Sequence, residues 1–203
     1  MPILENTFAT LALWGVIAYL LGSIPFGMII ARAMNLGNLR DIGSGSIGAT
    51  NVLRTGSKPA AAMTLIFDAG KGAVALLLAR YFAGEDAAQL AGVMAMLGHC
   101  YPVWLKFNGG KGVATFLGIM LAYAFPIGLA CCAAWLVGAL IWRISSVGAL
   151  TAAASSTFLL MFMGAPTALF MGMILTLLVY WRHRSNLARI RAGTEPKIGQ
   201  KST

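Results

Sequence analysis

Charged residues are scarce in this sequence, and acidic ones are scarcer still. Asp, Glu, Lys and Arg together make up 10% of the 203 residues, and only six of them are acidic. Soluble domains carry about 25% charged residues. Hydrophobic residues make up 59%, and the mean hydropathy is +0.79. This balance excludes an ordinary water-soluble domain and predicts an integral membrane protein.

Cysteine is also rare, with Cys100, Cys131 and Cys132 in or beside apolar segments. Their number is odd, and no Cys-x-x-Cys spacing or set of histidine ligands accompanies them. We therefore expect neither a disulfide nor a zinc site, and interpret the three thiols as small buried hydrophobic side chains. The net charge of +9 does not indicate a nucleic-acid partner, because the basic residues fall between apolar segments rather than in one stripe.

Long uncharged runs dominate the rest, and a membrane-spanning helix needs about 20 apolar residues. The run from Asn6 to Ala31 is longer than the core of a signal peptide and lacks a basic flank, so we expect a retained span. The run from Gly112 to Trp142 is too long for one helix, and we expect two helices meeting at Pro126. The expected spans are 7–32, 60–82, 87–105, 113–125, 127–142, 147–163 and 166–182.

The charges around these segments predict an orientation. With the N-terminus outside, Arg80, Glu5, Glu85 and Asp86 fall on the outer side. The cytoplasmic side receives Arg32, Arg40, Arg54, Lys58, Lys106, Lys111, Arg143, Arg182, Arg184, Arg189, Arg191, Lys197 and Lys201. The sequence thus predicts an all-α polytopic membrane protein with about seven transmembrane helices, its C-terminus cytoplasmic. Without repeats or a second domain, residues 1–203 form a single domain.

Three glycine-rich stretches interrupt the apolar chain: 44–51 followed by Arg54, 68–72, and 108–112. Glycine lets backbone N–H groups approach a ligand, while hydroxyls and cations add donors and charge, a mixture suited to phosphate. Neither Gly-Lys-Gly continues into a nucleotide-binding P-loop, so ATP hydrolysis is not expected. The candidate ligand-binding residues are Ser44, Gly45, Gly48, Thr50, Asn51, Arg54, Asp68, Gly70, Lys71, Gly72, Lys106, Asn108, Gly109, Gly110, Lys111 and Gly112.

Several ionisable residues have both a structural and a functional interpretation. Asp68 and Lys71 share a face of the second span, where they either pair with each other or form a site in which Lys71, at a broken helix start, reaches a phosphoryl group. His99 is either an interfacial polar group or a catalyst. His183, Asn186 and Glu195 lie in a basic segment that would otherwise anchor on anionic lipid, and Ser146 is most simply a helix cap.

Together these segments resemble the bacterial PlsY family of acyl-phosphate-dependent glycerol-3-phosphate acyltransferases, nearly from end to end. The resemblance rests on five motifs in order. They are Gly22-Ser23-Ile24-Pro25, the Ser44–Arg54 loop, Asp68–Gly72, Gly98–Pro102 continuing through Phe107–Thr115, and Arg182-His183-Arg184 with Asn186 and Gly193–Lys197. One departure is Ser46, where the family commonly has asparagine.

The resemblance implies transfer of a fatty acyl group from acyl phosphate to glycerol 3-phosphate, giving lysophosphatidic acid and phosphate at the start of phospholipid synthesis. It implies no cofactor, no metal and no acyl-CoA. The fold would be a seven-helix protein of the bacterial inner membrane with its site facing the cytoplasm. Contact with the enzyme that supplies acyl phosphate is a possible partnership.

For catalysis we expect Arg54, Lys71, Lys106 and Lys111 to neutralise the two anionic substrates. Glycine N–H groups with Ser44 and Asn51 are the candidates for oxyanion stabilisation. The proton acceptor is left open between His99 or His183 and a phosphate oxygen of the substrate, with the latter preferred because no orienting carboxylate is near in sequence. Glu195, Asn186 and Ser146 are further candidates for substrate binding. A transporter of an anion or organophosphate is the alternative function, and a membrane scaffold would not need such loops.

Overall fold

The computed structural model describes residues 2–199, and every regular element in this part of the chain is a helix, as predicted. Lys201, counted above with the basic side, lies outside the described residues. The α-helices are α1 Phe8–Gly22, α2 Phe26–Ala33, α3 Ala49–Leu53, α4 Lys58–Ala83, α5 Glu85–Cys100, α6 Val113–Tyr123, α7 Phe125–Trp142, α8 Ser145–Phe162, α9 Leu169–Arg182 and α10 Arg184–Arg191. Short 3-10 turns occupy Leu39–Asp41, Val103–Leu105 and Pro166–Ala168.

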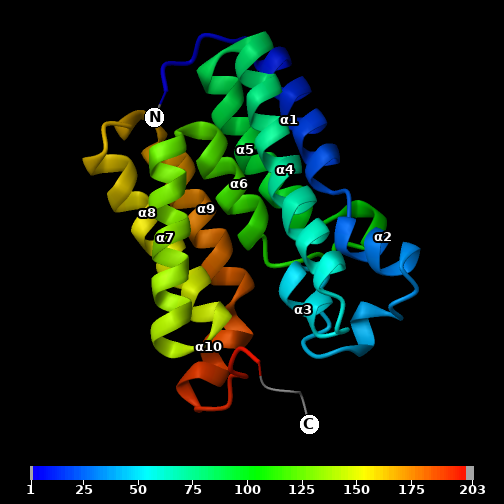
Figure 1. The fold of residues 1–203 in the computed structure, drawn as a ribbon. Helices are drawn as coiled ribbons and strands as arrows, with labels where there is room; N and C mark the ends of the chain where they lie inside the picture. Colours follow the sequence, from blue (N-terminus) through cyan, green and yellow to red (C-terminus); the bar gives the residue numbers. More distant parts are fainter. Residues whose placement is uncertain (1, 200–203) are drawn as a thin grey trace.

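The long helices lie side by side in one bundle (Figure 1). Helices α1, α4 and α5 pack together on one side, α7, α8 and α9 on the other, and α6 joins them by packing on both α4 and α7. Side chains such as Leu76, Met96, Phe116 and Leu160 fill the core between them and are fully buried. The small helices α2, α3 and α10 lie toward one end of the bundle, where the glycine-rich loops are also found.

Four helical segments are long and apolar enough to cross a membrane: Phe8–Ala33, Lys58–Ala83, Phe125–Trp142 and Ser145–Phe162. Helix α6 has 11 residues and extends only about 17 Å, whereas a bilayer core is about 30 Å thick. The predicted apolar segments are therefore present as helices, while the number of spans remains a prediction.

Two of the expected boundaries changed in the structure. The segment 7–32 is interrupted between Gly22 and Phe26, because Pro25 supplies no N–H to continue the helix. The segment 87–105 leaves the helix at Cys100, where the residue before Pro102 is held out of the helical region. The break at Pro126 is confirmed, since α6 ends at Tyr123 and Pro126 lies in the first turn of α7.

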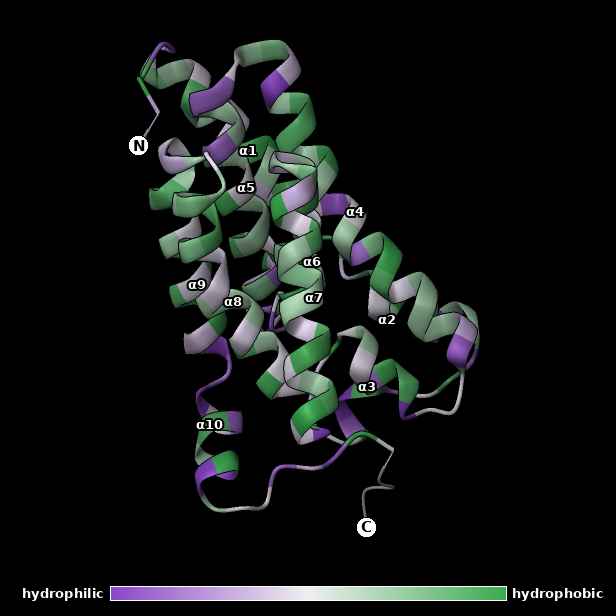
Figure 2. Ribbon diagram, turned by 60° about the vertical axis from the view of Figure 1, so that its left-hand side comes forward, coloured by the Kyte–Doolittle hydropathy of each residue, from purple (hydrophilic) through white to green (hydrophobic). Residues whose placement is uncertain are grey.

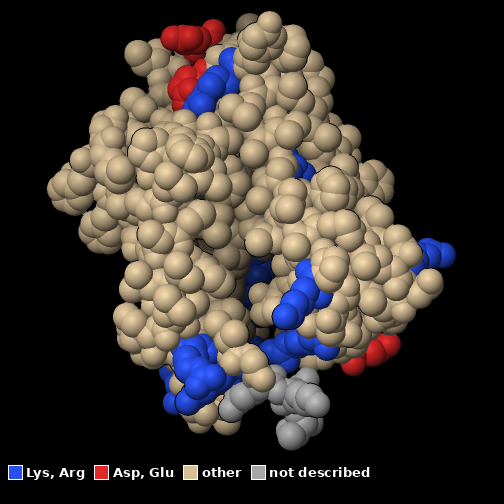
Figure 3. Space-filling view, viewed as in Figure 1, with Lys and Arg blue, Asp and Glu red and all other residues tan. Residues whose placement is uncertain are grey.

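The charges are divided between the two ends of the bundle. Lys and Arg gather at the end that carries α3 and α10, and the acidic residues at the opposite end lie beside one basic side chain (Figure 3). There Asp86 accepts hydrogen bonds from the N–H groups of Glu5 and Asn6, both at 3.0 Å, and Arg80 pairs with Glu85 at 2.9 Å. Hydrophobic residues predominate along the long helices between these ends (Figure 2).

Candidate active site

The first glycine-rich loop is held in shape by Asn51. This side chain is 2% exposed, and its amide donates to the carbonyls of Leu39 at 2.9 Å and Ser46 at 2.7 Å. Its amide oxygen accepts from the N–H of Ser44 at 3.3 Å. Because the amide is committed to its own loop, the predicted role of Asn51 in oxyanion stabilisation is corrected to a bracing one. The Ser44 hydroxyl is exposed and makes no hydrogen bond within residues 2–199.

The glycine-rich loop 108–112 caps the C-terminal end of α5. The N–H of Gly109 donates to the Cys100 carbonyl and the N–H of Gly110 to the His99 carbonyl, both at 3.1 Å. These bonds satisfy carbonyls that the end of a helix leaves free. A Cβ at position 109 would come within 2.1 Å of the His99 oxygen, so only glycine fits. The predicted use of these two N–H groups for an oxyanion is therefore wrong, because both are already occupied.

Two arginines outside the predicted site set connect the loops. Arg182 donates to the carbonyls of Gly109 and Gly110 at 3.0 Å each and stacks on Tyr101 at 4.9 Å. Arg40 donates to the Gly45 carbonyl at 3.0 Å and to the Asn108 carbonyl. The sequence predicts that both arginines lie at the basic end, but it does not show which cations hydrogen-bond to loop carbonyls. They fix the position of the segment that carries Lys111.

Replacing Arg182 by alanine is expected to lower kcat/KM of a reaction at this site about tenfold or more, mainly through KM, because the loop before Lys111 loses the two charge-assisted hydrogen bonds that Arg182 donates. Lysine at this position should restore only part of the loss, since one ammonium does not reproduce the two-pronged contact. Arg184→Ala is the matched control, because Arg184 stacks on Trp181 instead. Equal kinetics for Arg182→Ala and Arg184→Ala would contradict the loop-positioning role.

Lys111 and Arg54 lie on or beside the glycine-rich loops, and neither has a counter-ion within residues 2–199. Neither side chain makes a hydrogen bond in this part of the chain. Burial lowers the pKa of Lys111 to about 8; Glu195 opposes this shift, and the charges of Arg189, Arg54 and Arg182 add to it. The Arg54 side chain lies over Gly43, whose added Cβ would meet it at 2.6 Å. Two unpaired cations that influence each other form a candidate anion site.

The chain after α10 closes this site through Glu195. Its carboxylate accepts from the Ser146 hydroxyl at 2.7 Å, from the Asn186 amide at 2.5 Å and from Arg189 at 2.7 Å. Burial alone would raise the pKa of Glu195, but these hydrogen bonds outweigh it and lower the pKa. Three predicted residues are thus brought together, with Arg189 as an unpredicted member. Ser146 lies inside the first turn of α8 rather than at its cap, which is Ile144.

His183 lies between α9 and α10 with 2% of its surface exposed. Its Nδ1 is 2.8 Å from the Val179 carbonyl, which assigns the proton to Nδ1 and leaves the Nε2 lone pair free. Burial lowers the pKa of His183 to about 4; the carbonyl contact opposes this, and the Lys111 charge reinforces it. The imidazole is therefore neutral at pH 7 and lies within the electrostatic reach of Lys111.

Asp68, Lys71 and His99 form a separate cluster inside the bundle. Lys71 Nζ is 2.8 Å from Asp68 Oδ1 and donates to the Ile24 carbonyl at 2.8 Å, at the break between α1 and α2. His99 Nδ1 is 3.7 Å from the same carboxylate oxygen, and the ring is 3% exposed beneath Gly110. Helix α4 is continuous here, so the predicted broken helix start is wrong. The ion pair and the Ile24 carbonyl give Lys71 structural partners, and His99 is buried beside Asp68; functional roles for Lys71 and His99 stay predictions.

Of the remaining candidates, Gly70 and Gly72 lie within α4, and the others lie in or beside the loops. Gly72 packs on Thr115, where a Cβ would come within 2.8 Å, whereas a Cβ at Gly70 would meet nothing within 4 Å. Thr50 and Lys106 are exposed, and Asn108 donates to the Lys106 carbonyl. The glycines that shape turns or precede helices are Gly45 and Gly112, both with positive φ, and Gly48, which precedes α3.

A hollow separates α10 and the helices beside it from the part that carries α2 and α3, and Lys or Arg side chains lie in its wall (Figure 3). The loops with Arg54 and Lys111 meet at this end, joined by Arg40. The arrangement offers positive charge, free hydroxyl groups and a neutral imidazole at the end of an apolar bundle. Such a site suits a phosphate-bearing amphiphile.

Comparisons with known proteins agree with this chemistry. The sequence model of the family described as glycerol-3-phosphate acyltransferase matches residues 12–193. The chain is 66% identical over 198 residues to the glycerol-3-phosphate acyltransferase of Roseobacter denitrificans, covering 98% of this chain and 99% of that one. It is 64% identical to the protein of the same name from Ruegeria pomeroyi, covering 100% of both.

Solved structures give the same result. The crystal structure of PlsY, an integral membrane glycerol 3-phosphate acyltransferase, in its glycerol 3-phosphate form has a TM-score of 0.87 and 37% identity. That match covers 93% of this chain and 96% of the other. The lysophosphatidic acid form of PlsY has a TM-score of 0.84 and 36% identity, covering 93% and 95%.

Proposed function

The chain belongs to the glycerol-3-phosphate acyltransferase family, and we propose that it transfers a fatty acyl group from acyl phosphate to the 1-hydroxyl of glycerol 3-phosphate. The products are lysophosphatidic acid and inorganic phosphate. The observation that carries the proposal is the pair of unpaired cations, Lys111 and Arg54, on glycine-rich loops at the end of an apolar bundle. The related PlsY has been crystallised with glycerol 3-phosphate, which supports such an occupant.

We place the enzyme in the bacterial inner membrane with its N-terminus outside and the Lys111 end in the cytoplasm. The concentration of Lys and Arg at that end supports this orientation. The acyl chain of the donor would remain among apolar side chains, while both phosphates meet water and cations. A single site at the boundary then serves an apolar donor and a soluble acceptor.

Lys111 and Arg54 are proposed to neutralise the phosphate groups of the two substrates. Two anions repel each other, so bringing the glycerol hydroxyl to the acyl carbonyl requires compensating positive charge. Arg182 and Arg40 contribute by holding the loops, and the Glu195 cluster by closing the site. The free Ser44 hydroxyl, already predicted for this role, remains a proposed donor to the developing oxyanion, and the Lys111 ammonium takes the place of Asn51 and of the Gly109 and Gly110 amides.

For the proton of the attacking hydroxyl, we propose transfer to a phosphate oxygen of the substrate. His183 has a pKa of about 4 because it is buried, which makes it a weak base at neutral pH. The second pKa of a phosphate ester is about 6, so its oxygen is the stronger base. The single proton of the hydroxyl then points at the phosphate oxygen, so His183 would lie beside the hydroxyl without accepting its hydrogen bond.

The pKa of about 8 for Lys111 predicts a pH dependence of acceptor binding. An anion favours the protonated ammonium, so affinity is fully present below pH 8 and falls as the pH rises through this value. KM for glycerol 3-phosphate should rise about tenfold per pH unit beyond it, as expected for loss of one proton. Measuring KM from pH 6.5 to 9.5 checks this, with Lys111→Arg expected to flatten the curve. A wild-type KM that stays constant across this range would contradict the assignment.

Phosphate release tests the function itself. Purified protein supplied with acyl phosphate should release phosphate only when glycerol 3-phosphate is added, with one lysophosphatidic acid formed per phosphate. A transporter of an organophosphate would instead take up glycerol 3-phosphate into vesicles without releasing phosphate. Uptake without phosphate release would show that the protein is a transporter and not an acyltransferase.

A further inference from the structure

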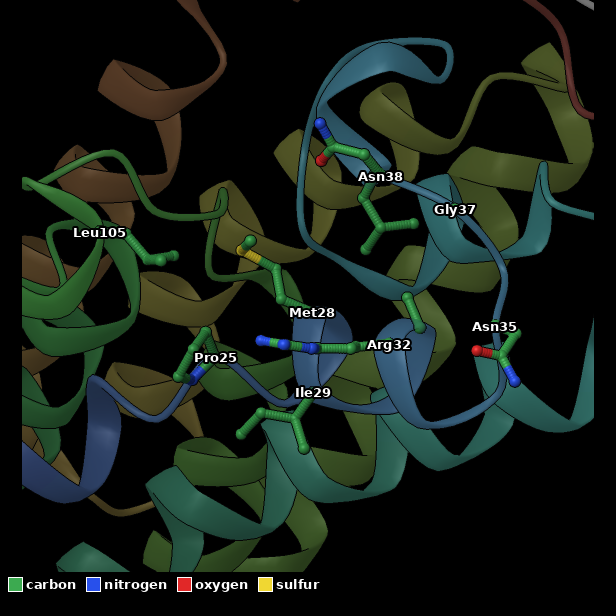
Figure 4. A pocket seen from close by; sticks show the side chains of 10 residues that line it. Pro25, Met28, Ile29, Arg32, Asn35, Gly37, Asn38 and Leu105 are labelled. Atoms are coloured by element: carbon green, nitrogen blue, oxygen red, sulfur yellow. The ribbon is translucent and has the colours of Figure 1, made fainter.

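A further cavity lies beside α2; among its lining residues Leu39 also contacts the first glycine-rich loop, through the carbonyl that accepts from Asn51. Its volume is about 560 Å³, and its walls include Pro25, Met28 and Ile29 from α2, Gly37 and Asn38 from the following turn, and Leu105 (Figure 4). Ligand sites in proteins commonly span about 300–1,000 Å³. This cavity, called here the α2 pocket, is large enough for part of an amphiphile.

The α2 pocket combines apolar walls with one free cation. Arg32 is exposed and makes no ion pair or hydrogen bond through its side chain within residues 2–199. Figure 4 shows its guanidinium end directed toward Pro25, between Met28 and Ile29. Its guanidinium offers charge-assisted donors to an anionic group.

The surface around the pocket is that of a membrane boundary. Ile29 is 49% exposed, and Trp104 and Phe107, close to Leu105 in the chain, are 60% and 58% exposed. Helix α2 diverges from the direction of α1 after Pro25 (Figure 1). Aromatic side chains and short amphipathic helices with basic residues are typical of the zone between headgroups and acyl chains. An occupant would therefore meet both lipid tails and water.

We propose that the α2 pocket binds an anionic membrane phospholipid. Its phosphate contacts Arg32, and one acyl chain runs over Met28, Ile29 and Leu105. The volume admits the headgroup and the start of a chain, and the remainder stays in the bilayer. The apolar walls favour a lipid over a free phosphate ester. The inference does not depend on acyl transfer, because none of these residues is assigned to the reaction.

Native mass spectrometry of the full chain in detergent, titrated with phosphatidylglycerol, tests the proposal. One tightly retained lipid is expected for the wild type, with Arg32→Gln weakening its binding roughly tenfold, the effect of losing one charge-assisted contact. Met28→Trp, which fills the pocket but keeps the charge, should weaken binding similarly. Lys58→Gln removes another exposed cation of the basic end and should leave binding unchanged. Unchanged elution and Tm establish that each variant is folded.

Three results would overturn the proposal. Equal binding by wild type and Arg32→Gln would show that Arg32 serves only the last turn of α2, where a cation is favoured anyway. Equal binding by Met28→Trp would place the lipid outside the pocket. Displacement of phosphatidylglycerol by excess inorganic phosphate, or equal retention of phosphatidylcholine, would show that the site recognises a free anion or lipid in general. Acyl transfer is measured separately, so failure of one proposal leaves the other intact.

Discussion

Alanine in place of Lys111 is expected to lower kcat/KM for glycerol 3-phosphate at least roughly a hundredfold, and activity should approach the detection limit. Removing one charge from a buried, hydrogen-bonded ion pair typically costs about 2–5 kcal/mol, and each 1.4 kcal/mol is tenfold. Lys111 has no other partner in the described structure, so its charge is available to the substrate. Steady-state phosphate release with varied acceptor measures the effect.

Arg54→Ala should cause a loss of similar size, and the double variant should lose less than the product of the two effects, because both cations act on the same anions. Ser46→Asn is the matched control. Only the backbone carbonyl of Ser46 accepts the hydrogen bond from Asn51, so a larger side chain there leaves the loop braced. Wild-type activity in both alanine variants would show that the anion site lies elsewhere.

The second large loss of activity is expected for Glu195→Ala. It removes the acceptor for three donors and leaves the buried Asn186 and Ser146, which are 3% and 5% exposed, without their partner. Such losses cost about 1–3 kcal/mol per unsatisfied group, so we expect a lower Tm as well as a roughly hundredfold lower kcat/KM. Thermal unfolding in detergent and steady-state kinetics report the two effects separately.

Glu195→Gln distinguishes the charge of this residue from its hydrogen bonds. The amide oxygen can still accept from Ser146 and Asn186, whereas the amide nitrogen that replaces Oε2 cannot accept from Arg189, so Tm should fall less than in Glu195→Ala. Loss of the negative charge lowers the pKa of Lys111 further, because Glu195 now raises it. The rise of KM with pH should therefore begin below pH 8. Glu5→Ala, at the opposite end of the bundle, is the control; an equal effect there would contradict a local role for Glu195.

Local sequence features predicted much of this fold. Uncharged runs became helices, and Pro126 separates α6 from α7, because a proline ring blocks helix continuation whatever lies around it. The charges were also divided as expected, with Arg80, Glu5, Glu85 and Asp86 together at one end. The interruption at Pro25 was predictable by the same rule, but the apolar residues on both sides favoured one unbroken span.

Sequence reasoning predicted which residues meet at this end of the bundle better than it predicted the hydrogen bonds that each of them makes. Ser146, Asn186 and Glu195 do meet, although about 50 residues separate the first from the last. Asn51 and the two glycine amides were assigned to an oxyanion because sequence shows donors but not competing acceptors. The free carbonyls at the end of α5 and in the Leu39–Ser46 loop take those donors.

The sequence also does not show which lysines and arginines are paired in the folded protein. Lys71 and Lys111 each lie in a Gly-Lys-Gly context, yet Lys71 compensates Asp68 and the open helix end at Ile24, while Lys111 stays unpaired. Likewise Arg182 and Arg40 hold backbone carbonyls, whereas Arg54 remains free. The Asp68–Lys71 pair was an open alternative in the sequence, but the contacts of Lys71 with Ile24, of Arg182 with residues 109–110 and of Arg40 with Asn108 join residues far apart in the chain, which one sequence does not reveal.

The most direct test of the central claim is the position of the phosphorus atom in a structure of this protein bound to glycerol 3-phosphate. The account predicts a phosphate held by both Lys111 and Arg54, with oxygens about 3 Å from each side chain, and the acceptor hydroxyl beside His183. A phosphate bound at Lys71, or one held without contact to Lys111 and Arg54, would contradict it.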